Sequence, residues 1–294
     1  MNILMLGGTG FFGIYAVKRL LENGHQVTIA TRGQTKNPFE GQTTHISLER
    51  TSAESIAKAL KGKSYDIIID NLVFCSNDVK YLLDVAECGK YVYSSTIAVY
   101  DEDLQMNMPE SHFDPLNTGS KEAPKYLIWC GREELPYGER KRQAERAIFQ
   151  AYSHIPAAAL RIPYVIGQDD FTKRLQFYVE HVLKELPMYI DNINESISFI
   201  FSEEAGEFLA WVAQNDIQGP INGSNPGTIS VGEIISYIEE KTNKKAIYSP
   251  NGDPGAYNGR LAFSALSTRA NKLGFHFAPL FPRFYNLLDW YISQ

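Results

Sequence analysis

Tyr137 and Lys141 place a phenol and an ammonium one helical turn apart in the segment Tyr-Gly-Glu-Arg-Lys. Positions i and i+4 of a helix share one face, so the two groups can lie side by side. A free phenol titrates at about pH 10, and a nearby cation favours its ionised form and lowers its pKa. This spacing therefore predicts that Tyr137 is a general acid/base for a substrate hydroxyl or carbonyl group, assisted by Lys141.

The same Tyr-x-x-x-Lys spacing occurs again at Tyr237 and Lys241, because a chain with 17 tyrosines produces such matches by chance. Position along the chain separates the two pairs. The first opens the helix expected between the fifth and sixth strands, whereas the second lies within an ordinary amphipathic helix pattern. We interpret Tyr237 as a packing residue and Lys241 as a surface charge.

A glycine-rich turn follows the first apolar segment, with Gly7, Gly10 and Gly13 in a G-x-x-G-x-x-G spacing. A strand before such a turn and a helix after it are typical of a dinucleotide site, where glycines admit the pyrophosphate and let the helix pack on the sheet. The alternative is a turn that needs glycine only for packing. The predicted cofactor-binding residues of this turn are Gly7, Thr9, Gly10, Phe11, Phe12 and Gly13.

The second expected strand ends in Thr31-Arg32-Gly33. Dehydrogenases that use NAD often carry an acidic residue at this point, where it binds the ribose hydroxyls. This chain has Arg32 instead, with Lys36 nearby, and both cations can meet a 2′-phosphate. The pattern favours NADP over NAD as the cofactor. The alternative is that Arg32 is a solvated loop charge.

Further polar residues lie where a substrate would need them. Ser95 and Thr96 end the fifth expected strand and can hold a substrate oxygen near the phenol, or else satisfy backbone groups at the strand end. Lys173 and Arg174 can meet a substrate diphosphate, and Arg260 is a weaker candidate for the same role. The alternative for these three cations is solvated surface charge.

Alternating strand and helix signals organise the first half of the chain. Strands are expected at 2–6, 25–31, 44–48, 66–74, 91–95 and 157–163, with helices between them that include 78–87 and 136–152. Repeated units of this length predict a doubly wound parallel sheet of the Rossmann type. We assign 1–167 to this dinucleotide-binding domain, with a later segment near 198–225 returning to it, and 168–294 to a smaller, mostly helical substrate lobe. The stretch 100–135 has little periodicity and is expected to be a long functional or mobile loop.

Composition narrows the class of protein. The 294 residues are 44% hydrophobic and 21% charged, as in a soluble globular enzyme, and the net charge of −6 makes nucleic acid an unexpected partner. The three cysteines lack C-x-x-C spacing and the six histidines are scattered, so no metal site is expected. No apolar run approaches the roughly 18 residues of a membrane helix, and the first apolar segment is too short for a signal peptide. We therefore expect a cytoplasmic protein that does not bind membranes.

Together these residues resemble the extended branch of the short-chain dehydrogenase/reductases, the NAD-dependent epimerase/dehydratase family, which includes nucleotide-sugar epimerases. The resemblance covers nearly the whole chain. It rests on the glycine turn, Ser94-Ser95-Thr96-x-x-Val99-Tyr100, Tyr137-Gly138-x-x-Lys141 with Glu145, Leu160-Arg161-x-Pro163-x-x-x-Gly167, and the segment 266–275. It implies a catalytic triad of Thr96, Tyr137 and Lys141, with Lys141 also on the cofactor ribose and Pro163 beside the nicotinamide. It also implies a substrate between the lobes, in contact with Ser95 and Tyr164, and a chain that can form a homodimer.

The resemblance predicts an enzyme that uses NAD(P) for transient hydride transfer on a nucleotide-sugar, with Tyr137 as general acid/base. Tyr164 stands where sugar epimerases often carry an asparagine. Two alternatives stay open. One is an NADPH-dependent reductase of a small carbonyl compound. The other is a non-catalytic protein that binds a dinucleotide or RNA, because Thr31-Arg32 and Arg161-Ile-Pro-Tyr-Val-Ile-Gly also resemble an atypical subgroup with chloroplast RNA-binding relatives.

Overall fold

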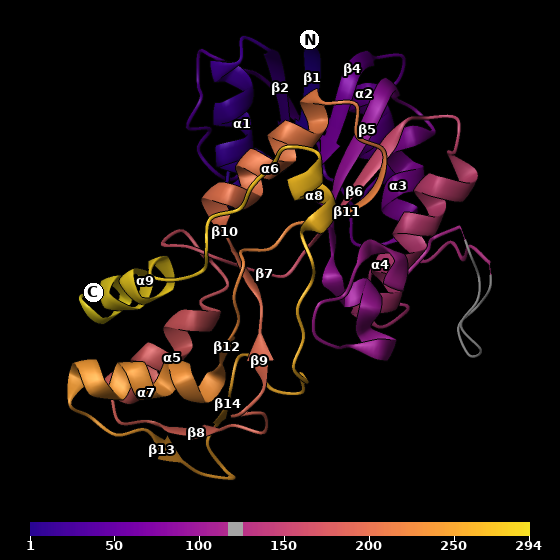
Figure 1. Cartoon of the computed structure of the whole chain (residues 1–294). Coiled ribbons are helices and arrows are strands. Elements are labelled where there is room, and N and C mark those ends of the chain that lie inside the picture. The colour runs from indigo at the N-terminus through magenta and orange to yellow at the C-terminus, as the bar shows by residue number, and fades with distance from the viewer. Residues whose placement is uncertain (117–125) are drawn as a thin grey trace.

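A parallel β-sheet forms the centre of the N-terminal domain (Figure 1). The computed structural model describes residues 1–116 and 126–294. Seven strands lie in the order β11-β6-β5-β4-β1-β2-β3, and all neighbours pair in parallel. The predicted doubly wound sheet is thereby confirmed. The strands are β1 (Asn2–Leu6), β2 (Gln26–Thr31), β3 (Thr44–Ser47), β4 (Ser64–Asp70), β5 (Glu87–Thr96), β6 (Ala157–Ile162) and β11 (Gly219–Asn222).

Helices cover both faces of this sheet, as Figure 1 shows. Side chains of a strand alternate between the two faces, so a doubly covered strand reads as a continuous apolar run. In β1, Ile3 and Met5 pack toward one set of helices and Leu4 and Leu6 toward the other. The first set is α1 (Phe12–Glu22) and α6 (Ser202–Gln214), and the second is α2 (Ala53–Leu60), α3 (Ser76–Leu83) and α4 (Tyr137–Arg146).

Several boundaries differ from the sequence prediction, and the largest differences are at the end of β4, the end of α3 and the start of β5. Strand β4 ends at Asp70 rather than at residue 74, because the Asp70 carboxylate accepts a hydrogen bond from the backbone N–H of Leu72 at 3.0 Å and turns the chain. Helix α3 ends at Leu83 rather than at residue 87, since Glu87 already pairs with β4 at the start of β5. The helix predicted for 136–152 is confirmed as α4 followed by one π-helical turn, Ala147–Ala151.

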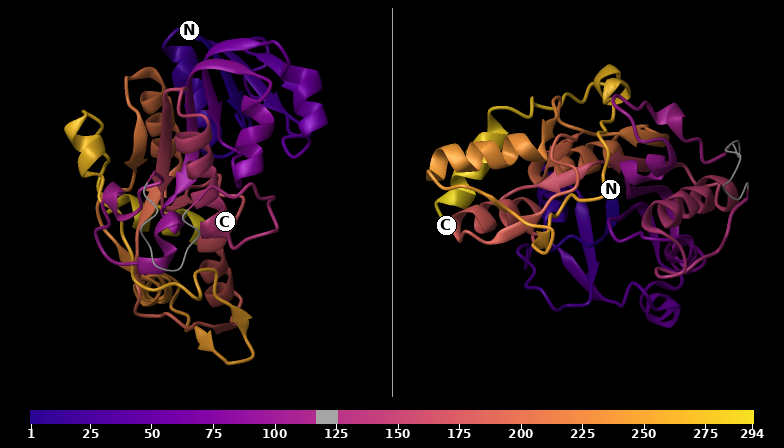
Figure 2. Two further views of the ribbon diagram at one scale, coloured as in Figure 1. Left: turned by 90° about the vertical axis from the view of Figure 1, so that its right-hand side faces the viewer. Right: turned by 90° about the horizontal axis from the view of Figure 1, so that it is seen from below.

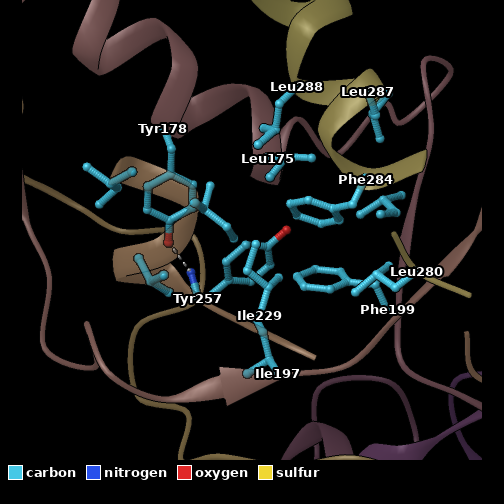
Figure 3. Packing of buried hydrophobic residues seen from close by; sticks show 14 of the residues in the cluster. Leu175, Tyr178, Ile197, Phe199, Ile229, Tyr257, Leu280, Phe284, Leu287 and Leu288 are labelled. Atoms are coloured by element: carbon cyan, nitrogen blue, oxygen red, sulfur yellow. Dashed lines mark hydrogen bonds between the residues drawn. The ribbon is translucent and has the colours of Figure 1, made fainter. Parts of the chain in front are cut away.

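The C-terminal lobe lies beneath the sheet domain in the side view (Figure 2, left). It contains α5 (Arg174–Leu183), α7 (Val231–Thr242), α9 (Arg283–Ile292), β8 (Pro187–Tyr189), β9 (Ser196–Ile197), β12 (Ile229–Ser230), β13 (Ile247–Tyr248) and β14 (Asp253–Pro254). Its core is rich in aromatic rings, and Figure 3 shows Tyr178, Phe199, Tyr257 and Phe284 converging there. The backbone N–H of Tyr257 donates to the Tyr178 hydroxyl at 3.1 Å, which ties α5 to the segment that follows β14.

The chain crosses between the two parts more than once. β7 (Tyr164–Ile166) pairs with β10 (Phe199–Phe201), and α6 then returns to the sheet domain. This helix packs on α1 so closely that a Cβ atom at Gly206 would lie 2.4 Å from the carbonyl oxygen of Phe12. β11 completes the edge of the sheet, and α8 (Thr268–Lys272) lies beside it. Residues far apart in the sequence therefore meet along the carboxyl ends of the strands.

The stretch 100–135 holds two short 3₁₀ helices, Ile97–Asp103 at its start and Glu110–His112. Part of the predicted long loop, residues 117–125, lies outside the described residues. Across 1–116 and 126–294, none of the helices combines the length and the apolar content that a membrane span requires.

Candidate active site

A cavity of about 660 Å³ runs along the carboxyl ends of the sheet strands, and we call it the first cavity. In doubly wound folds this edge of the sheet is the usual ligand site, and the volume is typical of a pocket for a small molecule. Most of the predicted site residues line it. They are Gly7, Thr9, Gly10, Phe11, Phe12, Arg32, Ser95, Thr96, Tyr137, Lys141, Pro163 and Arg174.

The glycine turn has the backbone geometry that its sequence predicts. Gly7 adopts φ +83°, which side chains disfavour. A Cβ atom at Gly13 would lie 2.1 Å from the carbonyl oxygen of Gly7, so Gly13 permits α1 to pack on the turn. Gly13 itself does not line the first cavity, and its role is to shape the turn. At Gly10, by contrast, no atom of the described residues lies within 4 Å of a built Cβ, so the backbone is open to a ligand.

These features fit a dinucleotide. The open backbone at Gly10 lies at the start of α1, whose first turn contains no acidic residue. The N–H groups of a helix start favour anionic oxygens, and an acid there would oppose them. Gly7, Thr9, Gly10, Phe11 and Phe12 would thus hold the diphosphate of the cofactor.

Lys141 is fixed at the wall of the first cavity. Its side chain is buried, and its Nζ donates to the backbone carbonyl oxygens of Val73 at 2.6 Å and Ser94 at 2.8 Å. These bonds hold the ammonium between the ends of β4 and β5. They use two of its three hydrogens, which leaves a donor for a ligand in the cavity. Burial lowers the pKa of Lys141 to about 8.

The second predicted catalytic residue, Tyr137, is the first residue of α4 and is 38% exposed. Thr96, the third, ends β5, and its Oγ1 accepts a hydrogen bond from the N–H of Ala98 at 3.2 Å. The acceptor role leaves the Thr96 hydroxyl hydrogen for a substrate oxygen. The structure therefore brings Thr96, Tyr137 and Lys141 to one cavity wall.

Ser95 lies over a buried charged pair. Its Oγ donates to Oε1 of Glu145 at 2.6 Å, and Glu145 receives two bonds from Arg161, at 3.0 and 2.5 Å. Arg161 also donates to the hydroxyl of Tyr100 at 3.0 Å. Because the charges compensate each other and the remaining polar atoms are bonded, the pair can stay buried and hold the end of β5 in place. Neither Glu145 nor Arg161 was predicted to have a role of its own beyond the motifs that carry the family resemblance.

A second cavity of about 440 Å³ adjoins the first. The two share four lining residues, namely Thr96, Tyr137, Pro163 and Arg174. Tyr164, Asn258 and Arg260 line the second cavity and not the first. The guanidinium of Arg174 lies 5.3 Å from the ring of Tyr164. Lys173, an exposed residue that precedes α5, lines neither cavity, and its substrate contact stays a prediction.

Arg32 lies at the opposite end of the first cavity from this junction. It is exposed, and its Nη1 lies 4.0 Å from Oε2 of Glu49, which also lines the cavity. Hydrogen bonds from the backbone and hydroxyl of Thr51 lower the pKa of Glu49, so an ionised carboxylate stands beside Arg32. Glu49 follows β3, so the lack of an acidic residue directly after β2 in the sequence gave no indication of it.

The second Tyr-x-x-x-Lys pair is structural, as predicted. The hydroxyl of Tyr237 donates to Asp289 at 2.9 Å, and its ring stacks on Tyr285 with centroids 4.5 Å apart. Lys241 forms an ion pair with the same Asp289 at 3.4 Å. Neither residue lines either cavity.

Several lining residues escaped the sequence analysis. Asn71, Arg132 and Phe171 reach the first cavity and Asn258 reaches the second. Arg132, Phe171 and Asn258 lie in segments without a periodic pattern, so the local sequence carries no signal for them. Asn71 follows the apolar strand β4 directly, and polar residues after a parallel strand are the one cue that was present. In the described parts of the chain, no group of three or more His, Cys, Asp or Glu side chains is arranged to hold a metal ion.

Two curated relatives each match part of the chain. Among curated relatives, a chloroplast stem-loop binding protein of 41 kDa from Arabidopsis thaliana is 27% identical over 131 residues, 39% of this chain and 34% of the relative. A probable UDP-arabinose 4-epimerase from the same plant is 27% identical over 200 residues, 57% of this chain and 44% of the relative. The chain thus spans less than half the length of these two relatives.

Solved structures share the fold over the whole chain. A putative epimerase from Burkholderia cenocepacia superposes with a TM-score of 0.74 at 15% identity, covering 100% of this chain and 98% of the other. UDP-glucose 4-epimerase from Thermus thermophilus, solved with NAD, gives 0.68 at 17% identity and covers 99% of both chains. The sequence model of the NAD dependent epimerase/dehydratase family matches residues 3–232. On this match, which includes the glycine turn and the Tyr137/Lys141 pair, the chain belongs to the NAD dependent epimerase/dehydratase family.

Proposed function

We propose that this protein is an NAD(P)-dependent enzyme that epimerises or dehydrates a nucleotide-sugar. One observation carries the proposal: the two cavities meet at Thr96, Tyr137, Pro163 and Arg174. The first cavity has the glycine turn of a dinucleotide site, and the second has no part of that turn. A cofactor and a substrate can therefore approach each other with the predicted acid/base between them.

The residues of the junction divide the proton chemistry among them. Bound NAD(P) supplies a hydride acceptor and donor at its nicotinamide ring. Tyr137 takes the proton of a substrate hydroxyl, and the ammonium of Lys141, which lines the same cavity, favours the ionised phenol. The hydroxyl of Thr96 donates to the same substrate oxygen. Pro163 lines the wall where both ligands meet.

The second cavity supports an anionic substrate. Arg174 and Arg260 both line it, and a guanidinium binds phosphate oxygens through paired N–H groups. Tyr164 gives it an apolar surface, backed by the ring of Tyr257 at 4.8 Å. This combination suits the diphosphate and the sugar or base of a nucleotide-sugar. The names of related proteins agree, since they include UDP-arabinose and UDP-glucose epimerases.

For the cofactor, the position of Arg32 in the first cavity supports NADP, as the sequence suggested. Glu49 beside it supports NAD, because a carboxylate accepts hydrogen bonds from ribose hydroxyls and repels a 2′-phosphate. We favour NADP, since Arg32 follows β2 directly.

Titration of NADPH and NADH by fluorescence tests this choice. Arg32→Ala should lower the affinity for NADPH by about tenfold or more and leave the affinity for NADH unchanged. Equal affinities that neither Arg32→Ala nor Glu49→Gln alters would contradict it.

A second candidate function is RNA binding without turnover. It is favoured by the 131-residue similarity to a chloroplast stem-loop binding protein. The net charge of −6 and the complete Thr96, Tyr137 and Lys141 set favour the enzyme instead. Binding of a labelled RNA stem-loop, measured at two salt concentrations beside NADPH titration, separates the two. Tight RNA binding with no dinucleotide binding would overturn the enzyme proposal.

A further inference from the structure

Arg132 is a cation held in the wall of the first cavity by contacts with the carboxylate of Asp78 and the backbone of Leu72. Its Nε lies 3.2 Å from both carboxylate oxygens of Asp78, and its Nη2 lies 3.1 Å from Asp78 Oδ2. The same Nη2 donates to the backbone carbonyl of Leu72 at 2.8 Å. The Nη1 group takes part in none of these bonds. The side chain is 28% exposed and lines the first cavity, so the remaining edge of the fork is within reach of a ligand.

The guanidinium of Arg132 also lies over an aromatic ring. Its central carbon lies 4.6 Å from the centre of the Phe74 ring, and the Nζ of Lys141 lies 5.2 Å from that same centre. Both cations therefore share one aromatic ring and one cavity wall. Asp78 is buried, and its carboxylate also accepts the N–H of Phe74 at 2.7 Å. Such an anchored guanidinium loses little conformational freedom when it binds an anion.

The position of Arg132 is beside the glycine turn. Leu72, whose carbonyl accepts from Arg132, has side-chain atoms 3.0 Å from a Cβ built at Gly7. The charge of Arg132 also affects the pKa of two other residues that line the first cavity. Burial is the main cause of the lowered pKa of Lys141, and Arg132 adds to it. Hydrogen bonds from Thr51 chiefly lower the pKa of Glu49, and Arg132 again contributes. Arg132 therefore lies close enough to influence both Lys141 and Glu49, which line the same cavity.

We propose that Arg132 is a further cofactor-binding residue, whose Nη1 edge contacts a phosphate oxygen of the bound dinucleotide across from the glycine turn. This inference rests on the proposed function, because it requires a dinucleotide in the first cavity. Guanidinium groups only donate hydrogen bonds, and a charged acceptor such as a phosphate oxygen gives a stronger bond than a neutral one. Arg132 belongs to the stretch 100–135, whose sequence shows little periodicity. The proposal therefore gives part of that stretch a function in cofactor binding.

Competition experiments separate this role from a purely structural one. The protein is loaded with NADH or NADPH, and adenosine and ADP-ribose are used to displace it, with cofactor fluorescence as the readout. Adenosine lacks the diphosphate and ADP-ribose contains it. Arg132→Ala should lower the affinity for the reduced cofactor and for ADP-ribose by about tenfold or more. The affinity for adenosine should change by less than about twofold. Arg132→Lys should recover part of the affinity, since it restores charge without the fork.

A matched control is Lys80→Ala. Lys80 pairs with Asp84 at 2.8 Å and lies 5.3 Å from the Trp129 ring, so it has a carboxylate and a ring as Arg132 does, yet it lines neither cavity. Its removal should leave all three affinities unchanged. Equal weakening of adenosine and ADP-ribose by Arg132→Ala, or no weakening of either, would overturn the inference while leaving the proposed function intact. Failure of the unmodified protein to bind any dinucleotide would overturn both.

Discussion

The hydroxyl of Ser95 donates its hydrogen to Glu145 at 2.6 Å, within a network that Arg161 closes. A hydroxyl has one hydrogen, so Ser95 can only accept from a substrate while this bond persists. Its neighbour Thr96 accepts from the backbone of Ala98 and keeps its own hydrogen. Two adjacent hydroxyls at the end of β5 thus have opposite hydrogen-bonding roles.

This division predicts different results for two substitutions. Thr96→Val removes the donor to the substrate oxygen and should lower kcat by about 10²-fold, as when one donor to a developing oxyanion is lost. Ser95→Ala should change kcat far less, but it should destabilise the fold by about 1–3 kcal/mol because Glu145 loses a buried partner. Steady-state kinetics and urea unfolding measure the two effects. A larger loss of kcat in Ser95→Ala than in Thr96→Val would contradict the assignment.

Gly10 and Gly13 offer a matched pair that separates binding from folding. A Cβ at Gly13 would overlap the carbonyl oxygen of Gly7 at 2.1 Å, so Gly13→Ala should destabilise the domain by several kcal/mol. A Cβ at Gly10 meets no atom of the described residues within 4 Å. Gly10→Ala should therefore keep its melting temperature and still lose cofactor affinity. Thermal unfolding and cofactor titration test both, and a cofactor affinity unchanged in folded Gly10→Ala would count against a ligand at this turn.

We predict that Lys141 sets an alkaline limit for activity. Burial lowers the pKa of its ammonium from 10.5 to about 8, so kcat should fall as the pH rises through about 8 and the phenol loses its cationic neighbour. The free energy of unfolding, by contrast, should increase with pH over the alkaline range. Between about pH 8 and 10.5 the unfolded chain binds a proton that the folded chain has lost, so the free energy of unfolding rises by at most about 1.4 kcal/mol per pH unit.

Lys141→Met isolates this effect, because it removes the titrating group and retains much of the apolar volume. Urea unfolding of both proteins at two alkaline pH values gives the comparison. The gain in stability with pH should be smaller in the variant by the contribution of one lysine. The same gain in both proteins would assign the effect to other groups.

Local sequence predicted those parts of the site that one segment builds alone. The turn from Gly7 to Gly13 needs only its own glycines and the flanking strand and helix, and the Tyr137/Lys141 face needs only helix geometry. The end of β4 was placed too far along the chain because Leu72 to Phe74 are apolar, and the Asp70 carboxylate that ends the strand is invisible to an apolar pattern. The position of Tyr237 along the chain and the amphipathic helix pattern around it were sufficient to exclude the second pair.

Residues that reach the site through tertiary structure could not be found in this way. Glu49 meets Arg32 because β3 pairs with β2, and Arg132 reaches the cavity because Asp78 and Leu72 hold it there. Asn258 comes from the C-terminal lobe, whose chain order says nothing about which loop faces Tyr137. Such contacts depend on how the lobes pack, and one sequence contains no local signal for that.

The central claim is that Tyr137 performs acid/base chemistry on a nucleotide-sugar beside a bound dinucleotide. The most direct measurement follows UDP-, GDP- and dTDP-sugars by NMR with cofactor-loaded protein and with Tyr137→Phe. We predict conversion of at least one sugar without net accumulation of reduced cofactor, and turnover about 10²–10⁴-fold lower in Tyr137→Phe with cofactor affinity retained. Equal turnover in Tyr137→Phe, or no conversion of any nucleotide-sugar by protein that holds its cofactor, would contradict the account.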